Sequence, residues 1–171
     1  MWSKLFNKSK EKNILVLGGE GCGKRSFVLH YKDGSIPAEE AIPEFRSLTC
    51  NKRLNDGRDQ IPLVFTLDRT SDAMIPSMSK AIKYDLILIL SDLSSKSAKQ
   101  DFDFYSDYAK IHFPNVKTIS VGTKEDQKLE SNVFDGLITT SVKTNQGFDK
   151  FEEHLMDSLN ITTHKKGLEL K

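Results

Sequence analysis

The chain has 171 residues, of which 37% are hydrophobic and 29% are charged, and its formal net charge is +1. This length suits one domain that buries about 70% of the surface exposed by the unfolded chain. The balanced charge excludes a general electrostatic attraction to nucleic acid. The two cysteines, Cys22 and Cys50, show neither a metal-binding spacing nor a disulfide framework, which favours a reducing, cytoplasmic location.

The first predicted elements are a strand, a glycine-rich loop and a helix, in that order. Residues 13–17 form a short apolar run, which is typical of a buried parallel strand. Residues 18–25 read GGEGCGKR and form the loop. Residues 26–31 then begin a helix, whose N-terminal amide groups and dipole would face an anion.

This loop matches the phosphate-binding pattern G-x-x-x-x-G-K-[ST] at every fixed position except the last, which is Arg25. Its glycines let backbone N–H groups surround a phosphate, and Lys24 would reach the outer phosphates. The flanking strand and helix argue against the alternative, a glycine-rich turn with an incidental lysine. We predict that the following residues bind phosphate: Glu20, Gly21, Cys22, Gly23, Lys24, Arg25 and Ser26.

The next predicted elements are strands. Residues 45–54 and 61–68 predict two strands joined around Asn55-Asp56-Gly57, a hairpin signal that places one antiparallel strand at a sheet edge. Further strands are predicted at residues 86–90, 116–121 and 137–140. Residues 86–90 are apolar on both faces, so their strand should be central.

Apolar side chains recur with helical spacing in two later segments, and we interpret both as core-facing helix surfaces. The first contains Phe102, Tyr105, Ala109 and His112, and the second contains Phe148, Phe151, Leu155 and Leu159. Alternation of strands and helices predicts an α/β fold with a six-stranded, mostly parallel sheet and helices on both faces. We expect one domain over residues 13–160, with tails at residues 1–12 and 161–171.

Two short polar motifs follow the later predicted strands. Residues 123–126, Thr-Lys-Glu-Asp, resemble the [NT]-K-x-D signature of guanine-nucleotide-binding proteins, and residues 141–143, Ser-Val-Lys, resemble the S-A-K motif. The aspartate can accept hydrogen bonds from N1–H and the exocyclic amine of guanine, which adenine cannot donate. This selects guanine by about 1–3 kcal/mol. The predicted base-binding residues are Thr123, Lys124, Asp126, Ser141, Val142 and Lys143.

The phosphate loop and the two base motifs, each following a strand, resemble the Ras superfamily of small GTPases over nearly the whole chain. The resemblance implies a P-loop G domain that binds GTP or GDP. Residues 4–6 and 34–45 look most like the Arf and Arf-like branch, whereas the T-K-x-D form is commoner in the Rho branch. The subfamily therefore stays open between Arf-like and Rab- or Rho-like forms.

Several positions depart from the family pattern, and they concern the metal or the γ-phosphate. Arg25 replaces the hydroxyl residue that would bind Mg²⁺, and residues 37–45 lack the threonine of switch I. Asp68 keeps the metal-side aspartate of the D-x-x-G motif. Ser71 replaces its glycine, and Asp72 occupies the position of the water-positioning glutamine.

These departures predict weak or absent GTP hydrolysis, and we assign no catalytic residue. Glu20 and Asp72 would place acids near the γ-phosphate. Asp68 is the one metal ligand we assign, so we expect Mg²⁺ to be absent or weakly bound, unless another loop supplies a ligand. Arg25 could pair with Asp68 in the place of the metal, or it could point outward along its helix.

The tails predict no direct membrane anchor. Arf-like proteins carry a glycine after the initiator methionine for myristoylation, and this chain carries Trp2. Residues 167–171 contain no cysteine for prenylation, and no apolar run reaches the length of a membrane span or reads as a secretory leader. We expect a cytoplasmic protein whose membrane contact is at most peripheral and mediated by a partner.

The expected function is that of a small-GTPase-like guanine-nucleotide-binding protein. It would act through contacts with protein partners, such as a regulator, an effector or the subunits of a complex. The alternative is a nucleotide-free pseudo-GTPase that keeps the fold as an interaction module. A P-loop small-molecule kinase would need arginine-bearing lid segments, and the base motifs argue against it.

Overall fold

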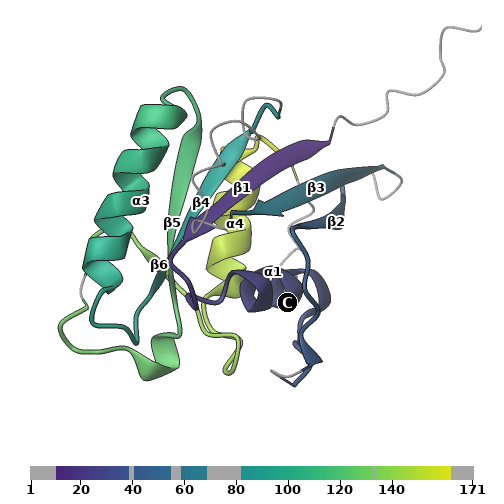
Figure 1. Cartoon of the computed structure of the whole chain (residues 1–171). Helices are drawn as coiled ribbons and strands as arrows, with labels where there is room; N and C mark the ends of the chain where they lie inside the picture. Colours follow the sequence, from purple (N-terminus) through teal and green to yellow (C-terminus); the bar gives the residue numbers. More distant parts are fainter. Residues whose placement is uncertain (1–10, 39–40, 55–58, 69–81, 133, 163–171) are drawn as a thin grey trace, which may run out of the picture.

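The computed structural model describes residues 11–38, 41–54, 59–68, 82–132 and 134–162, which form an α/β fold around one sheet (Figure 1). The strands are β1 (Lys12–Gly18), β2 (Ser47–Arg53), β3 (Gln60–Leu67), β4 (Leu86–Asp92), β5 (Lys117–Thr123) and β6 (Ile138–Thr139). The helices are α1 (Lys24–Asp33), α3 (Ala98–His112) and α4 (Phe148–Ser158), and a short 3-10 helix spans Glu125–Gln127. The six strands follow the order β2-β3-β1-β4-β5-β6.

The sheet is mixed, whereas the sequence predicted a mostly parallel one. The pairs β1–β3, β1–β4, β4–β5 and β5–β6 are parallel, and β2 pairs antiparallel with β3 at the edge of the sheet. A strand that turns straight back pairs antiparallel, because a parallel neighbour needs a crossover of about a dozen residues or more. The predicted turn, Asn55-Asp56-Gly57, lies outside the described residues.

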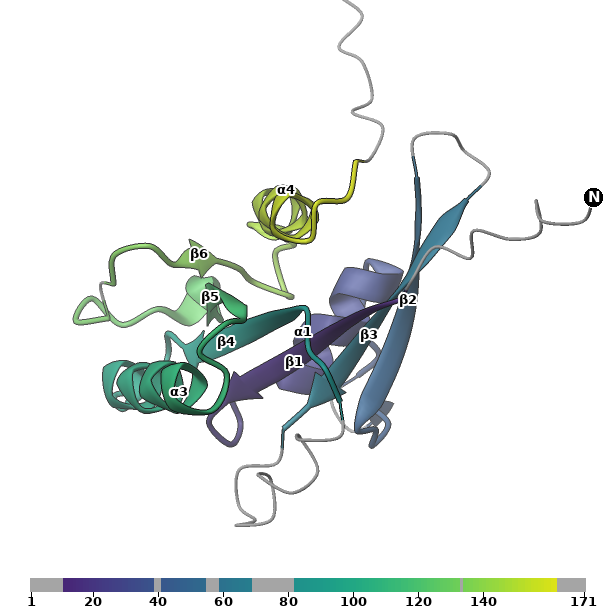
Figure 2. The ribbon, with the colours of Figure 1, turned by 90° about the horizontal axis from the view of Figure 1, so that it is seen from above.

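The core consists of two hydrophobic clusters that share the strands. Ile14 and Val16 of β1 enter the first cluster, which also contains residues of α1 and α4. Leu15 and Leu17 enter the second, which contains Tyr105 and Ala109 of α3. Successive side chains of a strand point to opposite faces. Figure 2 shows α3 and α4 well separated, with β1 and β4 between them. The central strands are therefore buried on both faces, as their apolar runs predicted.

The predicted apolar face of α4 is confirmed, because its four members are all buried. The predicted face of α3 is wrong at one position. Tyr105 and Ala109 are buried and Phe102 packs against them, but His112 is exposed. His112 is the last residue of α3, where it packs against the Tyr108 ring with centroids 4.3 Å apart.

Most of the two predicted tails lies outside the described residues. Lys12 already belongs to β1, and Ile161 packs in the first core cluster, so the ordered core extends slightly past both predicted boundaries. Within the described residues, no helix combines the length and apolar character that crossing a membrane requires.

Candidate functional site

The predicted phosphate and base motifs meet at one edge of the sheet. The glycine loop follows β1, Thr123 ends β5, and Ser141 lies just beyond β6. Because these strands are parallel, their carboxyl ends share one edge, which is where open α/β sheets bind ligands. The sequence order of the motifs therefore becomes proximity in space.

The loop backbone takes its shape from glycine. Gly21 and Gly23 have φ angles of 74° and 91°, in the left-handed region that side-chain-bearing residues rarely adopt. Helix α1 begins directly after Gly23, and no side chain caps it. The amide groups of its first turn, which have no acceptor within the helix, are thus left for an anion.

Gly18, the first residue of the loop, must be glycine because there is no room for a side chain at this position. A methyl group built on Gly18 would lie 2.6 Å from Cys22 Sγ and 2.7 Å from the Leu90 carbonyl oxygen. The Cys22 side chain is itself buried, and burial raises the pKa of its thiol despite the opposing charge of Lys24. Cys22 is therefore a packing residue of the loop and not a reactive thiolate.

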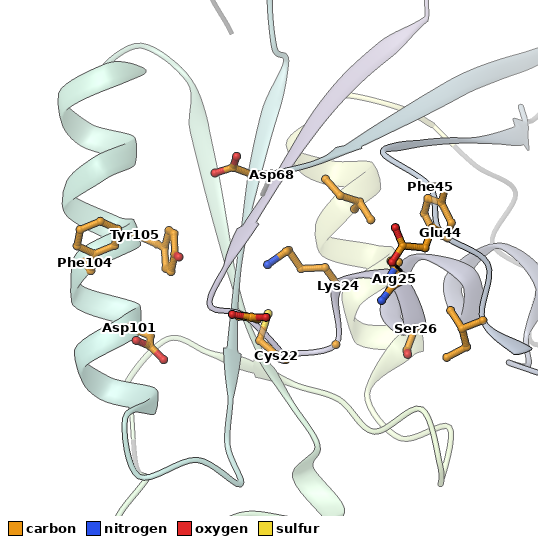
Figure 3. A pocket seen from close by; sticks show the side chains of 15 residues that line it. Cys22, Lys24, Arg25, Ser26, Glu44, Phe45, Asp68, Asp101, Phe104 and Tyr105 are labelled. Atoms are coloured by element: carbon orange, nitrogen blue, oxygen red, sulfur yellow. Dashed lines mark ion pairs between the residues drawn. The ribbon is translucent and has the colours of Figure 1, made fainter. Parts of the chain in front are cut away.

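The two cations of the phosphate motif have partners of different kinds. Lys24 Nζ donates to the carbonyl oxygens of Gly18 at 2.5 Å and Gly19 at 3.2 Å, so its side chain folds back and its amino group lies over the first half of the loop. Arg25 Nη1 lies 3.5 Å from Glu44 Oε1. In Figure 3 the Arg25 side chain lies beside Glu44 and well away from Asp68. Arg25 therefore does not pair with Asp68; it pairs with Glu44 at the cavity, an arrangement that the sequence did not predict.

A cavity of about 850 Å³ opens over the loop (Figure 3). It is lined by all seven predicted phosphate residues and by Asp68, which is buried after β3. The remaining lining residues are Ile42, Glu44, Phe45, Leu67, Asp101, Phe104 and Tyr105. Sequence reasoning missed the contribution of α3 entirely, because helical spacing marks Tyr105 only as a core residue.

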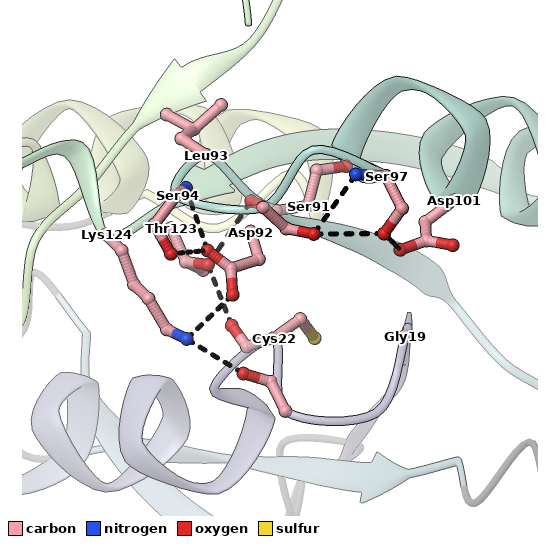
Figure 4. Close-up of polar contacts among 12 residues, drawn as sticks. Gly19, Cys22, Ser91, Asp92, Leu93, Ser94, Ser97, Asp101, Thr123 and Lys124 are labelled. Atoms are coloured by element: carbon pink, nitrogen blue, oxygen red, sulfur yellow. Dashed lines mark hydrogen bonds and ion pairs between the residues drawn. The ribbon is translucent and has the colours of Figure 1, made fainter. Parts of the chain in front are cut away.

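Two side chains of the predicted base motif form hydrogen bonds to the backbone of the phosphate loop (Figure 4). Thr123 Oγ1 donates to the Cys22 carbonyl oxygen at 2.7 Å, with the Ser91 carbonyl at 3.2 Å. Lys124 Nζ donates to the Gly21 carbonyl oxygen at 3.0 Å and to Asp92 Oδ2 at 2.7 Å. The structure thus brings Thr123 and Lys124 into contact with two of the predicted phosphate residues.

Two other predicted base residues, Asp126 and Ser141, contact each other. Ser141 Oγ donates to Asp126 Oδ1 at 2.6 Å and accepts from the Thr144 amide at 3.2 Å. Asp126 is exposed, so a ligand can reach its carboxylate. Val142 is half-buried against the first core cluster, and Lys143 is exposed. The structure therefore joins Asp126 to Ser141, whereas Val142 serves packing.

Asp92, at the end of β4, is a site residue that sequence reasoning missed. Burial raises the pKa of Asp92, but hydrogen bonds from Lys124 and Ser94 outweigh burial and hold the pKa below its ordinary value. The carboxylate is the acceptor that ties β4 to Lys124. No pattern in the sequence marks it, since its partner lies 32 residues away.

The Asp92–Lys124 contact should make the free energy of unfolding depend on pH in the acidic range. A carboxyl whose pKa is lowered by folding stabilises the protein above its unfolded pKa, about 3.9, and loses that contribution as pH falls through the folded pKa. We expect the difference in unfolding free energy between wild type and Asp92→Asn to be largest at neutral pH and to shrink below about pH 4. Urea titrations across this range measure it. Asp107→Asn, at an exposed position, should show no such trend, and a constant Asp92→Asn difference would contradict the interpretation.

No cluster of three or more His, Cys, Asp or Glu side chains suited to a metal ion occurs in the described part of the chain. Ser71 and Asp72, which the sequence assigns to the switch region, lie outside the described residues. Asp68 is thus the metal candidate that can be located, and Arg25 stands where a hydroxyl ligand was expected.

Comparison with protein-family models yields no matching family, and comparison with curated proteins yields no relative. The interpretation of the site therefore depends on its own geometry.

Proposed function

We propose that this chain is a small-GTPase-like protein that binds GTP or GDP at the carboxyl edge of its sheet. It would act through contacts with protein partners, and its GTP hydrolysis would be weak or absent. The carrying observation is the set of bonds from Thr123 and Lys124 to the carbonyls of Cys22 and Gly21. These bonds support the proposal, because they bring the guanine-type motif into contact with the phosphate-type loop.

The arrangement of the fold supports this proposal. The glycine loop lies between the central strand β1 and α1, and the base motif follows β5 in the same sheet. Helices α1 and α4 belong to one core cluster and α3 to the other. We propose that this is a P-loop G domain of the Ras-superfamily type, with helices on both faces of the sheet.

Each half of the site offers chemistry suited to one half of a guanine nucleotide. The loop glycines and the uncapped start of α1 supply amide donors for phosphate oxygens, and Lys24 supplies a cation. Asp126, oriented by Ser141, supplies an acceptor for the two donors of guanine. The bonds of Lys124 hold the two halves at a fixed separation.

Weak hydrolysis follows from the residues around the cavity. Its described lining contains no glutamine, histidine or threonine that could orient a water molecule. The residues also do not suit the Mg²⁺ of the family. Asp68 is present, but Arg25 takes the hydroxyl position and turns to Glu44. We therefore propose binding with Mg²⁺ absent or weakly held.

The alternative, a nucleotide-free interaction module, is favoured by a different observation. The three cations of the site already have partners within the protein: Lys24 the loop carbonyls, Arg25 Glu44, and Lys124 Asp92. Helix α3 also carries two exposed apolar side chains, Phe104 at 60% and Ile111 at 73%, seven residues apart on one side of the helix, and we propose that a protein partner contacts them. Both functions would use such a surface.

Nucleotide content separates the two functions. The purified full chain is heat-denatured, and the supernatant is separated by anion-exchange chromatography. Release of GDP or GTP in near-stoichiometric amount supports the proposed function. If the preparation is empty, it is titrated with GDP and ADP in a calorimeter. Binding of neither nucleotide would favour the interaction module.

Guanine preference should depend on Asp126. Asp126→Ala should reduce the GDP-over-ADP preference by about 1–3 kcal/mol, because the two donors of guanine lose their acceptor. Asp157→Ala removes an exposed carboxylate from α4, outside the site, and should leave the preference unchanged. Equal affinity of the unmutated protein for GDP and ADP would contradict base recognition by this residue.

A further inference from the structure

We propose that the site selects the diphosphate over the triphosphate, and that Asp101 of α3 determines this selectivity. The inference rests on the proposed binding of a guanine nucleotide and names the form that is bound. Asp101 belongs neither to the loop nor to the base motif, and it reaches the site from a helix that begins beyond β4.

The contacts of the loop give the site a direction. Its Gly21–Cys22 side is bonded to Lys124 and Thr123, which belong to the base motif. Its Gly19 side lies next to Asp101, at the other end of the loop in Figure 4. A nucleotide with its base at Asp126 would enter over Gly21, so its outermost phosphate would extend toward Gly19 and α3.

Asp101 is held against this outer end. A methyl group built on Gly19 would lie 3.1 Å from Asp101 Oδ2, so the carboxylate directly faces the loop. Ser97 Oγ donates to Asp101 Oδ2 at 2.9 Å, and Ser95 Oγ lies 3.0 Å from Ser97 Oγ. The two serines fix the carboxylate in place, because its rotation would break this chain of hydrogen bonds.

The charges around the cavity favour a shorter phosphate chain. Four carboxylates line it, from Glu20, Glu44, Asp68 and Asp101, against two cations, Lys24 and Arg25. Arg25 is paired with Glu44, so Lys24 is the cation beside the first half of the loop. A third phosphate adds negative charge at the end where Asp101 already stands, and such like-charge contact is costly.

Direct titration tests the proposal. GDP and a non-hydrolysable GTP analogue are titrated into the full chain, with Mg²⁺ and with EDTA. We expect GDP to bind at least about tenfold more tightly in both buffers, an electrostatic difference of about 1.4 kcal/mol. Asp101→Asn keeps the shape of the side chain and removes its charge. This variant should lower the ratio of the affinity for GDP to the affinity for the GTP analogue. It should do so by raising the affinity for the analogue, while the affinity for GDP changes little.

The matched control is Asp107→Asn. Asp107 lies on the same helix, is 72% exposed and pairs with Lys110. Its substitution therefore removes the same charge as Asp101→Asn at a position that does not line the cavity. Its selectivity ratio should equal that of wild type. Selectivity in wild type should also fall as salt is raised from about 50 mM to about 500 mM, since salt screens charge repulsion. This second measurement does not depend on a folded variant.

The outcomes separate the two proposals. Equal affinities for GDP and the analogue in wild type would overturn diphosphate selectivity and leave guanine-nucleotide binding intact. An Asp101→Asn variant that loses both affinities in proportion would overturn the assignment, because Asp101 would then be only structural. Failure of both nucleotides to bind would overturn the proposed function together with this inference.

Discussion

Replacing Gly147 with alanine should lower the free energy of unfolding by about 3 kcal/mol or more, the range of the most damaging single substitutions. Gly147 precedes α4 with a φ of 82°, a conformation that costs an L-residue about 1–2 kcal/mol. In addition, its new Cβ would lie 1.8 Å from the Thr139 carbonyl oxygen and 2.9 Å from the carbonyl carbon. These are backbone atoms of β6 and cannot rotate aside. Urea denaturation at neutral pH measures the loss.

Gly136→Ala is the matched control for this substitution. Gly136 has a φ of 76°, but a methyl group there would meet nothing within 4 Å. It should therefore cost only the conformational term of about 1–2 kcal/mol. The difference between the two variants isolates the contact with Thr139. Equal losses would mean that the segment before α4 shifts freely, and that Gly147 is needed for its conformation alone.

Phe151→Ala should lower the free energy of unfolding by about 3–5 kcal/mol, the usual cost of deleting a buried phenylalanine ring. Phe151 is 0% exposed, and its ring lies 4.9 Å from that of Phe27 and 5.3 Å from that of Tyr31, measured between centroids. Together with Phe148, which packs against Phe27 and His30, it holds α4 on α1. Chemical denaturation followed by circular dichroism gives the change.

The control for the core substitution is Phe104→Ala, which removes the same ring from a position that is 60% exposed. It should change stability by about 0.5 kcal/mol or less. A similar, small effect at Phe151 would contradict the packing described for the first core cluster. It would require the neighbouring side chains to close the space left by the ring.

The strands could be predicted wherever apolar runs mark them. Residues 86–90 are the buried apolar residues of β4, and residues 13–17 lie within β1. The last strand was predicted too long, over residues 137–140, because its pairing with β5 is limited to Ile138 and Thr139. The Thr140 carbonyl instead accepts a hydrogen bond from the Glu125 amide, so the chain has already turned toward the base motif.

The site could be predicted where a motif encodes it locally. All seven predicted phosphate residues line one cavity, and two of the predicted base residues, Thr123 and Lys124, hydrogen-bond to the same loop. Asp92, Asp101 and Glu44 could not be predicted, because each gains its role from a partner on another element. The chain contains 24 acidic residues, and nothing in their spacing separates these three from the rest.

The hydrogen bonds from Thr123 and Lys124 to the glycine loop can form only late in the synthesis of the chain. Thr123 and Cys22 are 101 residues apart, and Lys124 and Gly21 are 103 apart. During synthesis the glycine loop therefore leaves the ribosome well before the residues that clamp it, at about 5–20 residues per second. A fragment that ends before Thr123 cannot complete the site, however well its own strands pair. Nucleotide binding would thus report that β5 has docked, and a bound ligand would stabilise the finished protein and not its nascent intermediates.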